Sequence, residues 1–92
     1  MKYQLKYTRQ FRKSLKLCKK RGLDLTILED ILNKLQNGEM LPLENKAHKL
    51  TGNYRNCWEC HIQADWLLIW QQYEKELVLI MLDTGTHSDL FK

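Results

Sequence analysis

The feature that most constrains this chain is a change in hydrophobic spacing about halfway along its 92 residues. In the first half the apolar residues recur at helical intervals, whereas after residue 54 they alternate or run continuously, as in β-strands. Helices with one apolar stripe and strands with one apolar face must bury these surfaces against each other. A chain of this length supplies one small core, so we predict a single α+β domain over residues 1–92.

The first half predicts one strand and a helix. Residues 2–7 alternate weakly, as in a first strand. Thr8 can then cap a helix whose apolar stripe starts at Phe11, and Gly22 is a natural stop.

A second helix is predicted to begin near Asp24 or Thr26. Thr26 and Glu29 have the spacing of a capping box, and Gly38 ends the helix. The short link between the two helices predicts an antiparallel helical hairpin. Residues 42–52 are expected to form a loop.

The second half predicts a meander of three strands, at residues 54–62, 66–70 and 77–82. The first of these strands alternates between a core face and a largely polar face, and the other two are continuously apolar. The tail, residues 85–91, is predicted to form one helical turn capped by Thr86 or Ser88. We expect an antiparallel sheet with the helices packed on one face.

The charge indicates the kind of partner. The formal net charge is +4 and the pI is about 9.0, which favours nucleic acid, a ribosome surface or an acidic protein, although solubility alone is an alternative explanation. Six basic residues on the first helix exceed what solubility requires. We expect contacts to phosphates from four of them, with a solvated helix face as the alternative: Lys13, Lys16, Lys19 and Lys20.

The cysteines favour a reducing compartment. Three thiols, with no export signal and no apolar run long enough to span a membrane, indicate the cytoplasm and no membrane partner. The motif formed by Cys57 and Cys60 suggests a zinc or redox site. Residues three apart in a strand point to opposite faces, however, and no second cysteine pair follows. We therefore expect buried or half-buried thiols, with no metal and no cofactor.

The three histidines, His48, His61 and His87, all lie in polar contexts, in the loop, at a strand end and in the tail. Cutting RNA at a 2′-hydroxyl requires a base for its proton and an acid for the departing 5′ oxygen, and imidazole can serve as either. A nearby arginine such as Arg55 could stabilise the phosphate in the transition state. The alternative, zinc bound by the histidines and Asp65, lacks any characteristic local spacing.

Two blocks of sequence carry a family resemblance: "ECHIQADWLLIW" at residues 59–70 and "GTHSDLF" at residues 85–91, supported by "HKLTG" at residues 48–52 and by Tyr54 and Arg55. Together they resemble the YafQ group of the RelE/ParE toxin superfamily, from type II toxin–antitoxin systems, and the similarity spans nearly the whole chain. The resemblance implies a RelE-like fold, in which an N-terminal strand and a helical hairpin pack on a twisted antiparallel sheet. It also implies ribosome-dependent cleavage of messenger RNA, neutralised by a cognate antitoxin.

The resemblance further implies roles for individual residues. Its catalytic positions correspond to His48, His61, Asp65 and His87. Phe91 would stack on or position a base, and Trp66 is implied as a substrate contact beside the acid. We expect His87 to be the general acid. Either His61 or His48, helped by Asp65, would be the base or would hold the tautomer of the base.

The expected partners are an antitoxin, messenger RNA and the ribosome, with operator DNA reached only indirectly through the antitoxin complex. Two alternatives remain open: a non-catalytic, ParE-like inhibitor of gyrase, and a degenerate toxin acting as a transcriptional co-repressor. Three histidines and an acid favour the nuclease, because an inhibitor that acts by contact has no need of them.

Overall fold

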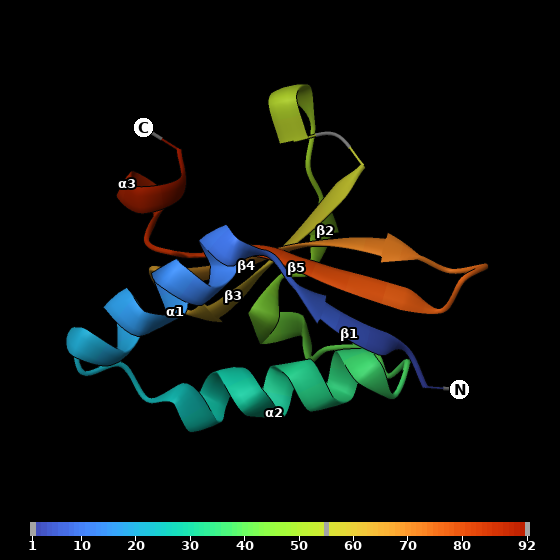
Figure 1. Ribbon diagram of the computed structural model, residues 1–92, viewed down its shortest axis with the longest axis horizontal. Coiled ribbons are helices and arrows are strands. Elements are labelled where there is room, and N and C mark those ends of the chain that lie inside the picture. The colour runs from blue at the N-terminus through green and yellow to red at the C-terminus, as the bar shows by residue number, and fades with distance from the viewer. Residues whose placement is uncertain (1, 55, 92) are drawn as a thin grey trace.

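A computed structural model describes residues 2–54 and 56–91, and the described elements form an α+β structure, as predicted (Figure 1). The strands are β1 (Gln4–Tyr7), β2 (His48–Lys49), β3 (Cys57–Gln63), β4 (Trp66–Tyr73) and β5 (Val78–Gly85). The helices are α1 (Arg9–Lys20), α2 (Leu25–Gln36) and α3 (His87–Leu90), with 3₁₀ turns η1 (Leu43–Asn45) and η2 (Gly52–Tyr54). No described helix has the length and apolar character needed to cross a membrane.

The strands form one sheet in the order β1-β5-β4-β3-β2. β3, β4 and β5 make the predicted antiparallel meander. β1, however, pairs with β5 in parallel, with Leu5 opposite Leu79. The sheet is therefore mixed, and the prediction of a wholly antiparallel sheet is wrong at this edge. No tight turn joins β1 to its partner, so no turn geometry fixes the direction in which they pair.

β2 lies at the other edge of the sheet, within the stretch predicted as a loop. Its two residues, His48 and Lys49, pair with Glu59 and Trp58 of β3. Two residues are too few to show a strand periodicity in the sequence. This short strand matters because it fixes His48 to the sheet.

The caps explain where the helices begin. The Thr8 hydroxyl accepts a hydrogen bond from the Phe11 amide at 3.0 Å and starts α1, as predicted. α2 begins after Asp24, whose carboxylate accepts from the Thr26 hydroxyl at 2.6 Å and from the Thr26 amide at 3.0 Å. These two bonds, the hydroxyl one first, hold the pKa of Asp24 below its usual value. Asp24 thus occupies the N-cap position, and the predicted capping box between Thr26 and Glu29 does not form. Figure 1 shows the chain reversing between α1 and α2.

Both faces of the sheet are covered, though unequally. α1 and α2 lie on one face, over a core that includes Phe11, Leu28, Ile31, Cys60, Trp66, Leu68, Trp70, Leu79 and Met81. The other face carries a smaller cluster formed by Cys57, Leu67, Ile69 and Leu90, with Leu50, Tyr54 and Leu82 packed against it. β4 is therefore buried on both sides, which accounts for its uninterrupted apolar sequence. The face of β3 predicted to be largely polar contains two buried residues, Cys57 and Glu59.

Candidate active site

The register of the sheet brings the end of β3 next to the start of the tail. Leu67 of the central strand β4 pairs with His61 of β3 on one side and with Gly85 of β5 on the other. β3 and β5 therefore present these two residues at the same end of the sheet. His87 follows Gly85 by two residues, so the predicted convergence of His61 and His87 is a consequence of strand pairing.

His61 and His87 face each other. Their ring centroids are 5.7 Å apart and the ring planes are tilted by 57°. His87 is exposed and His61 is half-buried. The two imidazoles thus lie close enough to act on one small group placed at the surface between them.

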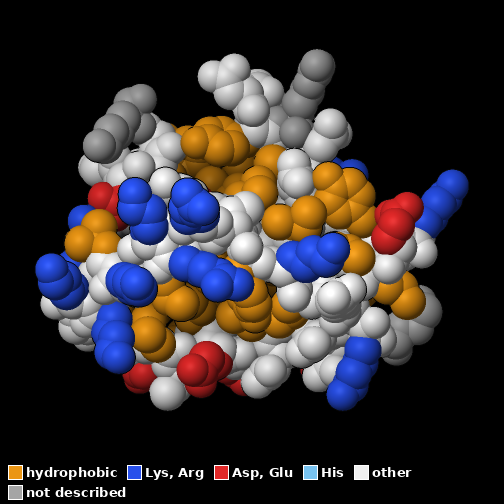
Figure 2. Space-filling model, in the orientation of Figure 1, with side chains coloured by type: hydrophobic (Ala, Val, Ile, Leu, Met, Phe, Trp, Pro, Cys, Tyr) orange, Lys and Arg blue, Asp and Glu red, His pale blue; other side chains and the backbone are white. Residues whose placement is uncertain are grey.

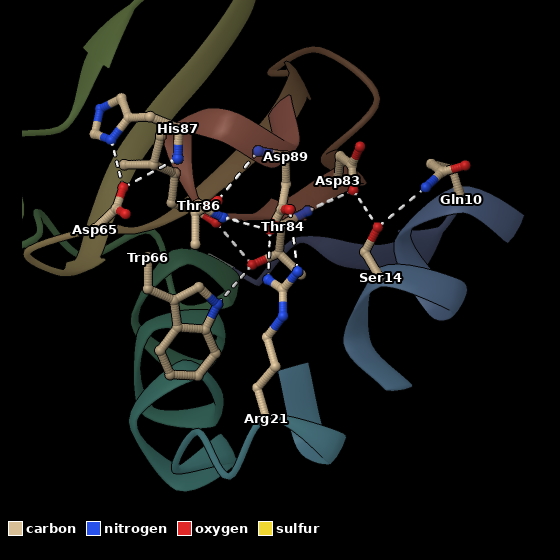
Figure 3. A network of polar contacts seen from close by, with 11 residues as sticks. Gln10, Ser14, Arg21, Asp65, Trp66, Asp83, Thr84, Thr86, His87 and Asp89 are labelled. Atoms are coloured by element: carbon tan, nitrogen blue, oxygen red, sulfur yellow. Dashed lines mark hydrogen bonds and ion pairs between the residues drawn. The ribbon is translucent and has the colours of Figure 1, made fainter. Parts of the chain in front are cut away.

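Asp65, in the turn between β3 and β4, holds His87 by two bonds (Figure 3). One carboxylate oxygen, Oδ1, accepts from the His87 backbone amide at 3.0 Å and lies 2.7 Å from ring atom Nδ1. These bonds, the backbone one first, lower the pKa of Asp65 below its ordinary value. An ionised carboxylate only accepts hydrogen bonds, so the proton of a neutral His87 ring lies on Nδ1.

The other two histidines have the same arrangement. The His61 Nδ1 lies 3.3 Å from the Ala64 carbonyl oxygen, and the His48 Nδ1 lies 2.7 Å from the Lys46 carbonyl oxygen. A carbonyl oxygen can only accept, so each Nδ1 donates. At His61 and His87 this leaves Nε2 as the nitrogen available for proton transfer, whereas Nε2 of His48 lies against Glu59.

His48 belongs to the same face of the sheet but contacts a different group. It pairs with Glu59, which lies two residues before His61 on β3 and so points to the same side. The His48 Nε2 lies 3.4 Å from Oε1 of Glu59, whose side chain is only 7% exposed. The second oxygen, Oε2, is buried without a hydrogen-bond partner among the described residues.

Sequence reasoning missed Glu59. The signal available was its position: an acidic residue within a strand, sharing the parity of His61, in a segment otherwise bound for the core. A buried carboxylate needs a compensating partner, and here that partner is His48.

The tail is fixed against the sheet by aromatic and apolar contacts. The Phe91 ring meets Tyr54 edge-on at a centroid distance of 5.3 Å and lies 6.4 Å from the His87 ring. The Tyr54 hydroxyl donates to the Leu90 carbonyl at 3.2 Å, and Leu90 is buried. Tyr54 was predicted to begin a strand on its core side, but it ends a 3₁₀ turn and supports the tail. Phe91 remains 41% exposed beside the histidines, where a base could stack on it.

This arrangement can carry out acid–base chemistry at one exposed point. Two imidazole rings lie side by side, a carboxylate orients one of them, and a second carboxylate pairs with a third histidine. No group of three or more His, Cys, Asp and Glu side chains suited to a metal ion occurs within residues 2–54 and 56–91.

Comparison with known proteins decides the family. A family model described as "Bacterial toxin of type II toxin-antitoxin system, YafQ" matches residues 3–92. The chain belongs to the YafQ toxin family.

Individual YafQ proteins are similar over their full length. The "mRNA interferase toxin YafQ" of Escherichia coli K12 is 34% identical over 88 residues, which cover 95% of this chain and 94% of that protein. The crystal structure of YafQ from E. coli BL21(DE3) superposes with a TM-score of 0.92 at 31% identity, covering 98% and 99% of the two chains. YafQ in the E. coli DinJ–YafQ toxin–antitoxin complex superposes with a TM-score of 0.90, also at 31% identity, with both chains fully covered.

One residue that the YafQ resemblance implied as a substrate contact lies in the core. Trp66 is 2% exposed and packs on the helix face of the sheet. Its indole N–H donates to the Thr84 hydroxyl at 2.9 Å, and that hydroxyl donates to the Leu67 carbonyl at 2.7 Å. Asp65 lies in the exposed turn, whereas Trp66 is the first residue of the buried strand β4 and packs in the core beneath the turn. The prediction that Trp66 contacts the substrate is therefore wrong.

The basic helix is exposed but does not adjoin the histidines. The four lysines predicted to contact phosphates lie exposed on one side of α1 and form no ion pair with the described carboxylates. We call them the lysine row: Lys13, Lys16, Lys19 and Lys20. Figure 2 shows Lys and Arg side chains gathered where α1 lies, on a face that shows no histidine. Arg55, predicted to stabilise the phosphate, lies outside the described residues.

The cysteines are buried, as expected. Cys60 packs in the core under the helices, and burial raises the pKa of its thiol to about 12. Cys57 belongs to the cluster on the opposite face. The two thiols therefore cannot bind one metal ion together, which agrees with the prediction from strand parity.

Proposed function

We propose that this YafQ-family chain is the toxin of a type II toxin–antitoxin pair and acts, as a single domain, by cutting messenger RNA on the ribosome. The observation that carries the proposal is the His61–His87 pair, with both Nδ1 atoms held by oxygen acceptors and both Nε2 atoms available. The full-length similarity to proteins named mRNA interferase toxins supports it.

The proposed reaction needs only side chains. A neutral histidine takes the proton of the 2′-hydroxyl through Nε2: His61, or His48 once its Nε2 has moved away from Glu59. The 2′ oxygen attacks phosphorus, the bond from phosphorus to the 5′ oxygen breaks, and protonated His87 gives its Nε2 proton to that departing oxygen. The products are a 2′,3′-cyclic phosphate and a 5′-hydroxyl. Asp65 accepts from Nδ1 throughout, so the His87 ring stays oriented as its charge changes.

Other groups would bind the substrate. Phe91 would stack on a base next to the cleaved phosphate, and Arg55 would stabilise the phosphate charge. The lysine row would hold RNA phosphates of the message or the ribosome at some distance from the cut, because it lies on a different face from the histidines.

The proposed partners follow from toxicity. A ribonuclease active in its own cytoplasm must be held inactive, and the relative in the DinJ–YafQ complex is bound by an antitoxin. We propose that a cognate antitoxin covers His61 and His87 or displaces the tail, with acidic residues on the basic surface. Contact with operator DNA would be made through that complex.

The test uses the purified chain with ribosomes translating a defined message. Primer extension should reveal cuts within the message, and a gyrase supercoiling assay should be unaffected. Cleavage of free RNA at high protein concentration should survive EDTA, because no step requires a metal. Gyrase inhibition without RNA cleavage would overturn the proposal in favour of a ParE-like toxin, and cleavage that is lost in EDTA and restored by zinc would overturn the metal-independent mechanism.

A further inference from the structure

α3 carries His87 but is too short to hold itself in place. It has four residues, a single turn, and an isolated helix of that length is unstable in water. Its position relative to His61 must therefore come from its contacts with the rest of the chain. Leu90, Tyr54 and Asp65 supply contacts from the sheet side.

A further contact comes from α1. Arg21, the C-cap residue of α1, donates to both oxygens of the Asp89 carboxylate, at 2.6 Å to Oδ2 and 3.2 Å to Oδ1 (Figure 3). This two-pronged geometry fixes both the direction and the distance between the groups. It joins residues that are 68 positions apart in the chain.

Asp89 transmits that contact to the start of α3. The same oxygen, Oδ2, accepts from the Thr86 amide at 2.9 Å, while the Asp89 amide donates to the Thr86 hydroxyl at 3.1 Å. These two bonds form a capping box around the first turn of the helix, and His87 is the first residue inside it. Moving Asp89 therefore moves the backbone from which the His87 ring extends.

Gly85 makes room for this arrangement. A Cβ atom at that position would lie 2.8 Å from Oδ2 and 2.9 Å from Cβ of Asp89. The carboxylate thus sits directly over the glycine, where only a residue without a side chain fits. The hydrogen bond from Arg21, more than any other cause, holds the pKa of Asp89 far below its ordinary value, so the carboxylate stays ionised at any pH at which a cell lives.

We propose that Arg21 is a positioning residue for His87: through Asp89 it sets the place of α3, and so keeps the His87 ring on Asp65 and facing His61. This inference rests on the proposed function, because it assigns Arg21 a part in RNA cleavage. Arg21 does not touch the reacting atoms, and it differs from the lysine row in having a carboxylate partner within the chain.

The proposal predicts unequal effects on stability and rate. The ion pair is partly exposed, with 39% of the Arg21 side chain and 28% of the Asp89 side chain accessible. Such pairs contribute little to stability, so Arg21→Gln should lower Tm by no more than about 5 °C. A misplaced acid has a larger effect on chemistry, since a displacement of about 1 Å can reduce a rate on the order of 10²-fold.

The experiment compares Arg21→Gln, Arg21→Lys and the control Lys75→Gln. Lys75 lies between β4 and β5, at the end of that hairpin remote from Gly85, and its replacement removes the same formal charge. We expect kcat for RNA cleavage to fall by roughly 10- to 100-fold in Arg21→Gln with KM within about twofold. Arg21→Lys should recover part of kcat, because lysine keeps the charge but not the two-pronged geometry. Lys75→Gln should match the wild type.

A second measurement reports on His87 without RNA. In the wild type, ¹⁵N chemical shifts should show the His87 ring protonated at Nδ1, and Arg21→Gln should shift the population toward the Nε2 tautomer. Unchanged kcat in Arg21→Gln would overturn the proposal, and so would a fall in kcat with an unchanged tautomer. If the wild type cuts no RNA, the proposed function fails, while the NMR measurement still decides whether Arg21 positions His87.

Discussion

At the scale of single residues, the chemistry of the site depends on which nitrogen of each imidazole is hydrogen-bonded to a neighbouring oxygen. Lys46, Ala64 and Asp65 each place an oxygen against one Nδ1, so all three rings carry a proton on that nitrogen although they come from three different elements. Two of these oxygens belong to the backbone. The positions of the ring protons therefore depend on the local path of the backbone as well as on the Asp65 side chain.

Glu59 offers a test at this scale, because its carboxylate is buried and one of its oxygens lacks a partner among the described atoms. Glu59→Gln keeps the shape and removes the buried charge, which is costly unless fully paired. We expect the free energy of unfolding to be unchanged or to rise by about 1 kcal/mol, and cleavage to fall by about tenfold as His48 loses its ionic partner. Urea denaturation and initial cleavage rates check the two parts. A marked loss of stability would show that the Glu59–His48 contact is structural.

The sequence pointed to the histidines and Asp65 more readily than to the residues that hold them in place. His61 and His87 were recognisable because polar residues at a strand end and in a glycine-preceded tail have no role in a core. Glu59 and Tyr54 were not recognisable, because the alternation of residues along a strand does not tell which of its faces a later segment of the chain covers. Trp66 was misplaced because it follows Asp65 directly in the chain, but Asp65 lies in an exposed turn and Trp66 is the first residue of a buried strand.

At the scale of elements, the helices and the meander followed from periodicity, but the pairing of β1 and the existence of β2 did not. Periodicity reports how one segment is buried and carries no information about its neighbour or its direction. The turn of α3 was predicted with Thr86 or Ser88 as its cap, and the structure shows that Thr86 is the cap. What the sequence did not show is that α3 is fastened to α1 by Arg21 and Asp89.

Gly85 tests the close packing beneath α3. Gly85→Ala places a methyl group against Asp89, including its Cβ, so the start of α3 must shift. We expect cleavage to fall by at least tenfold. The control is Gly22→Ala, where φ is +83° and nothing lies within 4 Å: it should cost about 1 kcal/mol of stability through backbone strain and leave kcat unchanged. Equal cleavage by both variants would contradict the close-packing argument.

The Asp89 link also predicts a pH dependence. The pKa of Asp89 is depressed in the folded state by Arg21. A carboxyl of this kind stabilises the fold above its unfolded pKa, which is about 4, and the contribution is lost as the pH falls toward the folded value. The Tm difference between wild type and Asp89→Asn should therefore be constant from pH 7 to about 5 and shrink below about pH 4. A difference that stays the same down to pH 2.5 would show that Asp89 acts through packing alone.

At the scale of the whole molecule, the two surfaces proposed to act on RNA lie on different faces. The histidines sit beside α3 on the side of the smaller apolar cluster, whereas the lysine row lies on α1. The Arg21–Asp89 contact marks the place where the two surfaces approach each other. An RNA held by both would have to pass around this edge, so it would have to be longer than an RNA that contacts the histidines alone.

Salt dependence tests the role of the lysine row. Each phosphate contact to single-stranded RNA contributes about 0.7 to the slope of log affinity against log salt. Changing Lys13, Lys16, Lys19 and Lys20 together to Gln should therefore flatten the slope by up to about 3, while Lys75→Gln should leave it unchanged. Binding measured between about 50 and 200 mM salt decides the question. An unaltered slope in the fourfold variant would make the row a solvated helix face.

The central claim, that this molecule cuts RNA with the His61–His87 pair, is tested most directly by the single-turnover cleavage rate of His87→Gln on a ribosome-bound message. Glutamine retains the backbone bond to Asp65, and the His87 side chain is 54% exposed, so Tm should stay within a few degrees of the wild type. Removing the acid should slow cleavage by about 10²- to 10⁴-fold and abolish growth arrest on expression. Cleavage by His87→Gln at the rate of the wild type would contradict the claim.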